Sequence, residues 1–166
     1  MSEIGLGEKV KLGVISDTHL HLANQELAEL MAGPFKEVDR IVHAGDLTEL
    51  AVLEAFQGKE VVAVCGNMDS PSVRKQLPSQ RVFPVGKFKI GLVHGWGAPP
   101  GIEERIRREL EDVDCIIYGH THTPSQNLQQ GTFFFNPGSF GGGVIRQRSV
   151  GLLELGSTIS GQIIYL

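Results

Sequence analysis

Short apolar runs alternate with helical patterns through the first two thirds of this chain of 166 residues. Residues 12–16, 40–44 and 60–65 have the length and composition of buried strands. Residues 25–31 and the segment near 49–56 have helical patterns instead. Because strands that alternate with helices form parallel βαβ units, this part of the chain predicts a parallel sheet buried on both faces.

The pattern changes in the last part of the chain. Residues 81–85 and 88–93 flank Gly86-Lys87, which is a hairpin signal. A charged helix is expected at residues 102–110, and strands are expected at residues 115–118, 125–129, 132–135, 150–155 and 161–166. We therefore predict an α/β (α+β) chain with a mixed sheet, or two packed sheets, and helices outside. It is expected to form one domain over residues 1–166, with residues 1–9 as a flexible N-terminal extension.

The charge balance narrows the range of partners. The chain has 15 Lys and Arg against 19 Asp and Glu, a formal net charge of -4. This argues against a protein that binds DNA or RNA through an extended basic surface. A phosphate-containing substrate stays open, because bound metal ions would not appear in this count.

Two further features concern the compartment. Cys65 and Cys115 each lie within an apolar run, which is typical of reduced core thiols and not of a disulfide framework. The first residues contain no long apolar segment of a secretory signal, and no apolar run approaches the roughly 20 residues that span a bilayer. We expect a cytoplasmic protein with no membrane association.

Five of the expected strands are followed by side chains that can bind metal ions. These are Asp17 and His19 after residues 12–16, Asp46 after 40–44, Asn67 after 60–65, His94 after 88–93, and His120 and His122 after 115–118. Ligands of open α/β sheets bind at the carboxyl ends of the strands. Singly, such an Asp is more often a cap or turn residue, and such a His is more often structural. Together, the five positions predict a metal site.

The residue types indicate what kind of metal site this is. The set has oxygen and nitrogen ligands and no thiolate, which excludes structural zinc on cysteines and suits Mn, Ni, Fe, Zn or Co. Seven ligands are too many for one ion, whereas a carboxylate can bridge two. Two ions about 3.5–4 Å apart are a device for hydrolysing phosphate esters.

The motifs resemble the calcineurin-like metallophosphoesterase superfamily. Its D-x-H, G-D, G-N-x-D/E, H and G-H-x-H motifs occur here in order over residues 17–122, and N-P-G-S at 136–139 is similar to a segment of its small bacterial and archaeal phosphodiesterase branch. The resemblance implies a four-layer α/β/β/α sandwich of two mixed sheets flanked by helices. It also implies a site for two metal ions at the sheet edge.

The resemblance divides the seven ligands between two ions. One ion would be held by Asp17, His19, Asp46 and His122, and the second by Asp46, Asn67, His94 and His120. Asp46 would bridge the ions, and hydroxide between them would attack phosphorus. Asn67 would also contact a phosphate oxygen, so the expected catalytic residues are Asp46, Asn67 and His94. Mn is the first expectation for both ions, with Ni, Fe, Zn and Co as alternatives.

Two positions depart from the family pattern. Met68 stands where many members have a His that acts as general acid, and a thioether cannot deliver a proton. Because the phosphodiesterase branch also tends to lack that His, Met68 favours diesters as substrates. Trp96 stands where some relatives have a second His. It offers either an apolar wall for a substrate ring or only core packing.

Several other polar residues have two interpretations each. His21 is a proton donor or a solvated loop residue. His43 either binds a metal ion or, as we expect, packs in the core or hydrogen-bonds to the site. Arg146 and Arg148 bind substrate phosphate or are solvated charges. Asp69 is interpreted as a turn residue before Pro71.

The sequence therefore predicts a metal-dependent phosphoesterase, foremost a phosphodiesterase, acting on a small phosphodiester. A phosphomonoesterase is one alternative. Another is a protein-binding scaffold, as in the small subunit of the retromer sorting complex, which the chain resembles in length and in its N-P-G-S segment. That branch has partly eroded metal motifs, whereas every ligand position here holds a competent ligand. Relatives often form dimers or tetramers, so a homo-oligomer is also expected.

Overall fold

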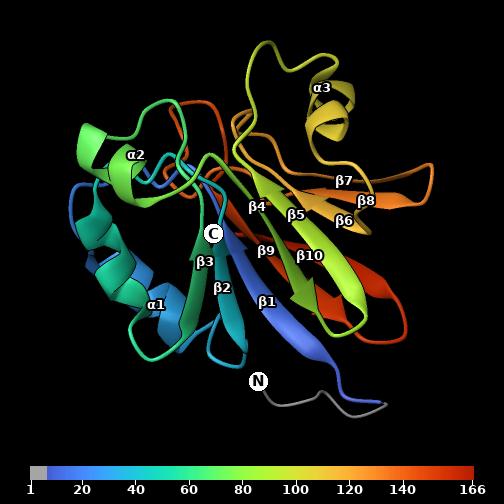
Figure 1. The fold of residues 1–166 in the computed structure, drawn as a ribbon. Helices are drawn as coiled ribbons and strands as arrows, with labels where there is room; N and C mark the ends of the chain where they lie inside the picture. Colours follow the sequence, from blue (N-terminus) through green and yellow to red (C-terminus); the bar gives the residue numbers. More distant parts are fainter. Residues whose placement is uncertain (1–6) are drawn as a thin grey trace.

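Two five-stranded sheets pack face to face in the computed structural model, which describes residues 7–166 (Figure 1). The first sheet has the order β10-β9-β1-β2-β3. Its strands are β1 (Val10–Ile15), β2 (Arg40–His43), β3 (Glu60–Ala63), β9 (Ser149–Leu155) and β10 (Ile159–Tyr165). Strands β1, β2 and β3 are parallel, whereas β9 pairs antiparallel with both β1 and β10. The sheet is therefore mixed.

The second sheet has the order β4-β5-β6-β8-β7. Its strands are β4 (Gln80–Val85), β5 (Phe88–Val93), β6 (Cys115–Ile117), β7 (Ser125–Gln129) and β8 (Thr132–Asn136). Strands β5, β6 and β8 are parallel, and the hairpins β4–β5 and β7–β8 add antiparallel strands at the two edges. Gly86 has a φ of 57° in the first hairpin turn, a conformation that glycine adopts without strain. The predicted Gly86-Lys87 hairpin is confirmed.

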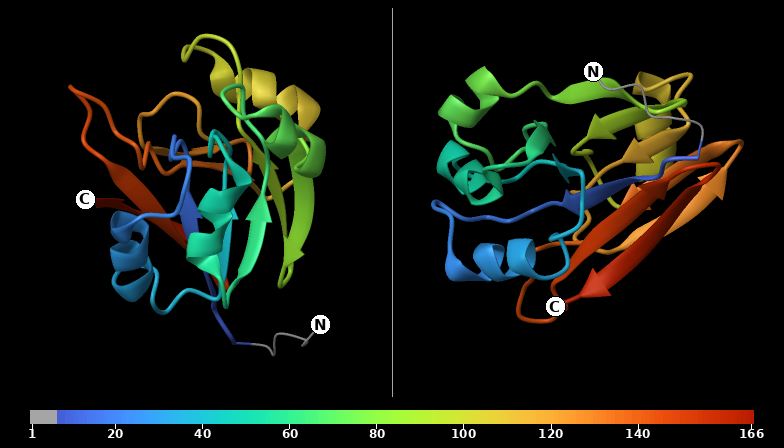
Figure 2. Two further views of the ribbon diagram at one scale, coloured as in Figure 1. Left: turned by 90° about the vertical axis from the view of Figure 1, so that its left-hand side faces the viewer. Right: turned by 90° about the horizontal axis from the view of Figure 1, so that it is seen from below.

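Helices cover the outer face of each sheet (Figure 2). On the first sheet these are α1 (Gln25–Ala32), the 3₁₀-helix η1 (Leu50–Phe56) and α2 (Pro71–Gln76), and on the second sheet α3 (Ile102–Glu109). Leu27, Phe56 and Val73 pack in the first helix layer, and Ile102 and Ile106 in the second. A third cluster joins the facing sides of the two sheets. The predicted four-layer α/β/β/α sandwich is confirmed.

Local capping explains where the helices begin. Asn24 accepts a hydrogen bond from the Leu27 N–H at the start of α1, and Ser70 accepts one from the Val73 N–H at the start of α2. The sequence analysis did not identify α2, and the helix expected near 49–56 is a 3₁₀-helix. Of the expected N-terminal extension, residues 1–6 lie outside the described residues. No helix in the described part of the chain is long and apolar enough to cross a membrane.

The topology brings the carboxyl ends of both sheets together. Ile15, His43 and Ala63 are paired across β1, β2 and β3 at their final positions. In the second sheet β5 and β6 run parallel and end side by side. The loops that follow are tied by backbone hydrogen bonds, with the Gly119 N–H donating to the His94 carbonyl at 3.0 Å. All five ligand-bearing loops therefore meet at one edge of the sandwich.

Candidate metal centre

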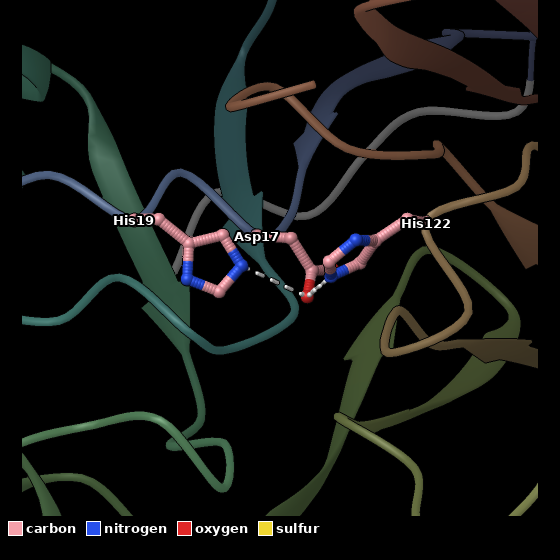
Figure 3. Close-up of side chains that lie close together, drawn as sticks. All are labelled: Asp17, His19 and His122. Atoms are coloured by element: carbon pink, nitrogen blue, oxygen red, sulfur yellow. Dashed lines mark ion pairs between the residues drawn. The ribbon is translucent and has the colours of Figure 1, made fainter. Parts of the chain in front are cut away.

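Asp17 lies at the middle of this edge, in the loop after β1, and its side chain is fully buried. Its Oδ2 accepts hydrogen bonds from the Ser16 hydroxyl at 2.5 Å and the His120 N–H at 3.2 Å. Its Oδ1 faces imidazole nitrogens, with Nε2 of His122 at 3.0 Å and Nε2 of His19 at 3.7 Å (Figure 3). Two loops from different sheets thus converge on one carboxylate oxygen.

His94 approaches the same carboxylate from β5. Its Nδ1 donates to the Ala44 carbonyl at 2.7 Å, so Nε2 of the neutral ring carries no proton. That nitrogen lies 3.2 Å from Oδ2 of Asp46 and 3.8 Å from Oδ1 of Asp17. In that neutral form, the nitrogen lone pair faces carboxylate lone pairs in a buried space.

Among the described residues, three buried side-chain atoms have no hydrogen-bond partner, and all three lie in this cluster: Oδ1 of Asp17, Nε2 of His19 and Nε2 of His94. An unpaired buried polar group costs about 1–3 kcal/mol, so three around one point need a common partner. A divalent cation would supply it, because carboxylate oxygen and imidazole nitrogen are ligands for such ions. The donor set fits a metal centre.

Two groups of three ligand atoms lie within 4.8 Å of one another. One contains Asp17, His19 and His122, and the other contains Asp17, Asp46 and His94. The carboxylate that both groups share is Asp17, whereas the family resemblance gives the bridging role to Asp46. That role stays a prediction.

Asn67 and His120 extend the cluster on the side of the second sheet. Oδ1 of Asn67 lies 3.2 Å from Nδ1 of His120. Nε2 of His120 donates to the Gly97 carbonyl at 2.9 Å, which leaves Nδ1 unprotonated in the neutral ring. The rings of His120 and His94 meet edge to face at 5.3 Å. The structure thus brings all seven predicted ligand residues into one connected cluster.

The backbone is strained where the ligands attach. Asp17, His19, Asp46, His120 and His122 all have φ between 49° and 69°. Left-handed conformations are uncommon for residues other than glycine and cost roughly 1–3 kcal/mol each. The surrounding hydrogen bonds therefore hold these residues in place against a local energetic preference.

Two glycines beside the ligands leave no room for a side chain. A Cβ on Gly66 would collide with the Asp46 carboxylate, and a Cβ on Gly119 would collide with the Ser16 hydroxyl. Close approach of these backbones is what allows loops from the two sheets to share the site.

The facing charges shift three pKa values. Burial by itself raises the pKa of Asp46, but the facing His94 ring and the Met68 amide outweigh it, and the net pKa is lowered. Burial by itself lowers the pKa of His94, but Asp46 and Asp17 outweigh it, and the net pKa is raised. Asp17 also raises the pKa of His122. The cluster attracts positive charge, as a cation site must.

Asp69 holds two of the ligand loops together, a role that the sequence analysis did not identify. Its side chain is buried and accepts the N–H of Thr48 at 2.6 Å, of Gly66 at 2.7 Å and of Asp46 at 3.1 Å. The sequence does indicate the local contact, because an Asp side chain in a turn often accepts a nearby backbone N–H such as that of Gly66. The long-range contacts to the loop after β2 have no sequence signal.

The N-P-G-S segment supports the site from behind. Asn136 donates to the Gly119 carbonyl at 3.1 Å and to the Thr121 hydroxyl at 3.0 Å. The Ser139 hydroxyl donates to the Asp17 carbonyl at 3.1 Å. This segment therefore fixes the loops that carry Asp17, His120 and His122.

His43 also supports the loops and does not face the ligand cluster. Its Nδ1 accepts the Gly45 N–H at 3.1 Å, and its Nε2 donates to the Thr18 hydroxyl at 3.2 Å. Burial lowers its pKa to about 4, so the ring is neutral near pH 7. The structure therefore shows the expected supporting role, with hydrogen bonds to the loops that carry the ligands.

The other predicted residues differ in their relation to the centre. Arg146 donates to the Thr121 carbonyl, and its charge opposes protonation of His122, which places it beside the site. Arg148 instead pairs with Glu26 at 3.0 Å and packs over Phe140, so it serves the fold.

Three more residues have exposed side chains. His21 is exposed, and no described hydrogen bond or ion pair joins it to the centre. Met68 is 60% exposed and contributes its backbone N–H, which donates to Oδ1 of Asp46 at 2.8 Å. Trp96 is 42% exposed.

Fold and site together are those of a phosphoesterase class, and comparison with known proteins agrees. Residues 10–158 match the family model described as the calcineurin-like phosphoesterase superfamily domain. The chain belongs to this family.

Two curated archaeal proteins from Methanocaldococcus jannaschii are similar to it. A probable metallophosphoesterase is 37% identical over 138 residues, which are 81% of this chain and 70% of that protein. A phosphodiesterase is 27% identical over 158 residues, 87% of this chain and 93% of that protein.

Solved structures share the fold. A Thermotoga maritima protein is 33% identical with a TM-score of 0.71, and the match covers 95% of this chain and 99% of that one. A single mutant of Vps29 from Entamoeba histolytica is 26% identical with a TM-score of 0.73, with the same coverage of both chains.

Removal of divalent metal should lower the thermal stability of the protein. A metal ion present at about one hundred times its Kd adds about 2.7 kcal/mol to the free energy of unfolding. In a chain of this size, 1 kcal/mol shifts the midpoint of thermal unfolding by about 2–4 °C. We expect a fall of roughly 5–10 °C with a chelator in scanning calorimetry, restored by Mn²⁺. The variant Asp17→Asn should show little difference between the two conditions. Equal midpoints for the wild-type protein would contradict the metal centre.

Asp69→Asn should weaken metal binding and destabilise the fold. In the wild-type protein both Asp69 oxygens accept backbone N–H groups. The NH₂ group of the new Asn would replace one of these oxygens and leave a backbone N–H without an acceptor, at a cost of about 1–3 kcal/mol. Urea unfolding measures the stability, and calorimetric titration with Mn²⁺ measures the affinity. Asp39→Asn is the matched control, because exposed Asp39 accepts the Lys11 N–H at 2.8 Å far from the site. Equal metal affinities for the two variants would argue against the role of Asp69.

Proposed function

We propose that this chain is a phosphodiesterase that depends on two divalent metal ions. The observation that carries the proposal is the buried Oδ1 of Asp17. This oxygen has no hydrogen-bond partner, and it faces the Nε2 atoms of three histidines. The family match and the similarity to an archaeal phosphodiesterase support the reaction class. A small diester fits a chain that carries a net charge of -4, because its affinity would come from the site and not from a basic surface.

The ligands would be divided as the family pattern implies. Asp17, His19, Asp46 and His122 would hold one ion, and Asp46, Asn67, His94 and His120 the second. Mn²⁺ is the first choice, with Ni, Fe, Zn or Co as alternatives. When bound, the pair supplies Lewis-acid polarisation of the phosphoryl group and activation of water for attack on phosphorus.

The chain's own residues orient this centre and the substrate. The Ala44 and Gly97 carbonyls fix the tautomers of His94 and His120, so each ring presents an unprotonated nitrogen to the cluster. Asn67 is proposed to contact a phosphate oxygen. Arg146, held against the Thr121 carbonyl beside His122, is proposed to neutralise a further oxygen of the phosphate.

Met68 favours a diester whose leaving group needs no proton. Its thioether cannot act as an acid, and it lies exposed beside Asn67. Phenolic leaving groups depart as anions more readily than alkoxides do. Activated diesters should therefore be hydrolysed better than alkyl monoesters.

A scaffold role is the second candidate, and the fold shared with Vps29 is the observation that favours it. The cluster argues for an enzyme, because all seven ligand positions of the family pattern hold side chains that can bind a metal ion. Hydrolysis of bis(p-nitrophenyl) phosphate with Mn²⁺ or Ni²⁺ tests the two directly. Absence of turnover in protein shown to hold two ions would favour the scaffold.

Asp46→Asn should reduce phosphodiester hydrolysis by more than the roughly 10–100-fold that outer-shell partners of a metal contribute. The reason is that one carboxylate is proposed to hold both ions. His21→Ala is the control and should keep near wild-type kcat/KM. If Asp46→Asn kept most of its activity and its metal content, the bridging role would be wrong.

Met68→His should increase phosphomonoester hydrolysis relative to diester hydrolysis. General-acid assistance is worth about 10²–10⁴-fold where an acid is well placed, and we expect the ratio to rise toward the lower end of that range. Steady-state rates on glycerol 2-phosphate, an alkyl monoester that needs a proton on its leaving group, and on bis(p-nitrophenyl) phosphate give the ratio, with Met68→Leu as the control. An unchanged ratio would show that Met68 does not set the preference.

A further inference from the structure

A cavity of about 360 Å³ opens beside the candidate metal centre, and Asn67 and His94 form part of its wall. The remaining wall includes Arg74, Gln80, Trp96 and Glu109. Its volume lies within the range of about 300–1,000 Å³ that small-molecule sites have. A molecule whose phosphate lies at the ligand cluster would therefore have space beside it for one substituent.

Trp96 gives this cavity a flat aromatic surface on a fixed loop. The Arg105 guanidinium donates to the Trp96 carbonyl at 2.9 Å and to the Pro100 carbonyl at 3.0 Å, and it also bonds the Ala98 carbonyl. His120 donates to the neighbouring Gly97 carbonyl. Because the loop is held at four carbonyls, a substrate ring that packs against the indole would not need to order it.

The other wall is polar but electrically balanced. Arg74 on α2 is tied by its guanidinium to the Asp69 carbonyl at 2.9 Å and to the Asn67 carbonyl, and Glu109 supplies an opposite charge. The Gln80 amide can both donate and accept hydrogen bonds. This environment suits a neutral ring with polar edges and not a second phosphate.

We propose that the cavity receives one ester group of the diester, that this group is a nucleobase-bearing nucleoside, and that Trp96 is its stacking surface. This inference rests on the proposed function. It assigns Trp96 a specificity-determining role, with the base between the indole and the polar wall of Arg74 and Gln80. Stacking on an aromatic side chain tolerates every base, because each has a flat face.

Trp96 is the only tryptophan of the chain, so its fluorescence reports directly on this cavity. The Mn²⁺-loaded protein is titrated with adenosine 5′-monophosphate and, separately, with ribose 5-phosphate, with excitation at the red edge of indole absorption. We expect a saturable change with the nucleotide and a much smaller change with the sugar phosphate. Equal responses to both, or no response to the nucleotide, would overturn the proposal. This measurement requires no turnover, so it decides the cavity even if diester hydrolysis fails.

A second experiment measures selectivity. The ratio of kcat/KM for thymidine 5′-(p-nitrophenyl phosphate) to kcat/KM for methyl p-nitrophenyl phosphate is determined for each variant. Loss of one base–aromatic stack should lower this ratio about tenfold in Trp96→Ala, whereas Trp96→Phe should keep most of it. Leu128→Ala removes an exposed apolar side chain on β7 and is the control. An unchanged ratio in Trp96→Ala would contradict the stacking role.

Discussion

The rest of the site depends on one buried carboxylate. Asp17 has one oxygen fixed by the Ser16 hydroxyl and the His120 N–H, and the other oxygen faces imidazole nitrogens and has no hydrogen-bond partner. A protein interior does not leave such groups unpaired without cost. Left-handed backbone at five ligand residues adds to that cost. Both effects raise the free energy of the folded state, and a bound cation would lower it by pairing with the buried atoms. This is the physical basis for considering the cluster functional.

The two sheets have different parts in building this arrangement. The first sheet supplies the carboxylates at the ends of β1 and β2, and the second supplies imidazoles after β5 and β6. Side chains that are not ligands brace the loops: Ser139 joins the second sheet to the Asp17 loop of the first, Asn136 holds the His120 loop within the second sheet, and Asp69 holds the Asp46 loop within the first. The site is consequently a property of the whole sandwich. Changes well outside the cluster should act on it by moving one sheet edge against the other.

Much of this organisation was predictable from the sequence. Apolar runs gave the strands, and because parallel strands end at a common edge, polar residues after each run identified the seven candidate ligands. What could not be predicted depends on contacts between distant segments. Asp69 was interpreted as a turn residue because its partners, the Asp46 and Thr48 amides, lie in another loop. Arg148 could not be separated from Arg146 until its pairing with Glu26 was seen. Neither the carboxylate shared by the two ligand groups nor the cavity beside Trp96 has a signature in local sequence.

The central claim is that this edge of the sandwich holds a pair of divalent ions. Anomalous diffraction from crystals grown with Mn²⁺ tests it most directly, because the signal locates the metal without reference to activity. The account predicts two peaks about 3.5–4 Å apart, with Asp17 and Asp46 within bonding distance and the His94 and His122 rings turned toward them. Crystals that showed no peak at this edge, or a peak that none of these side chains contacts, would contradict it.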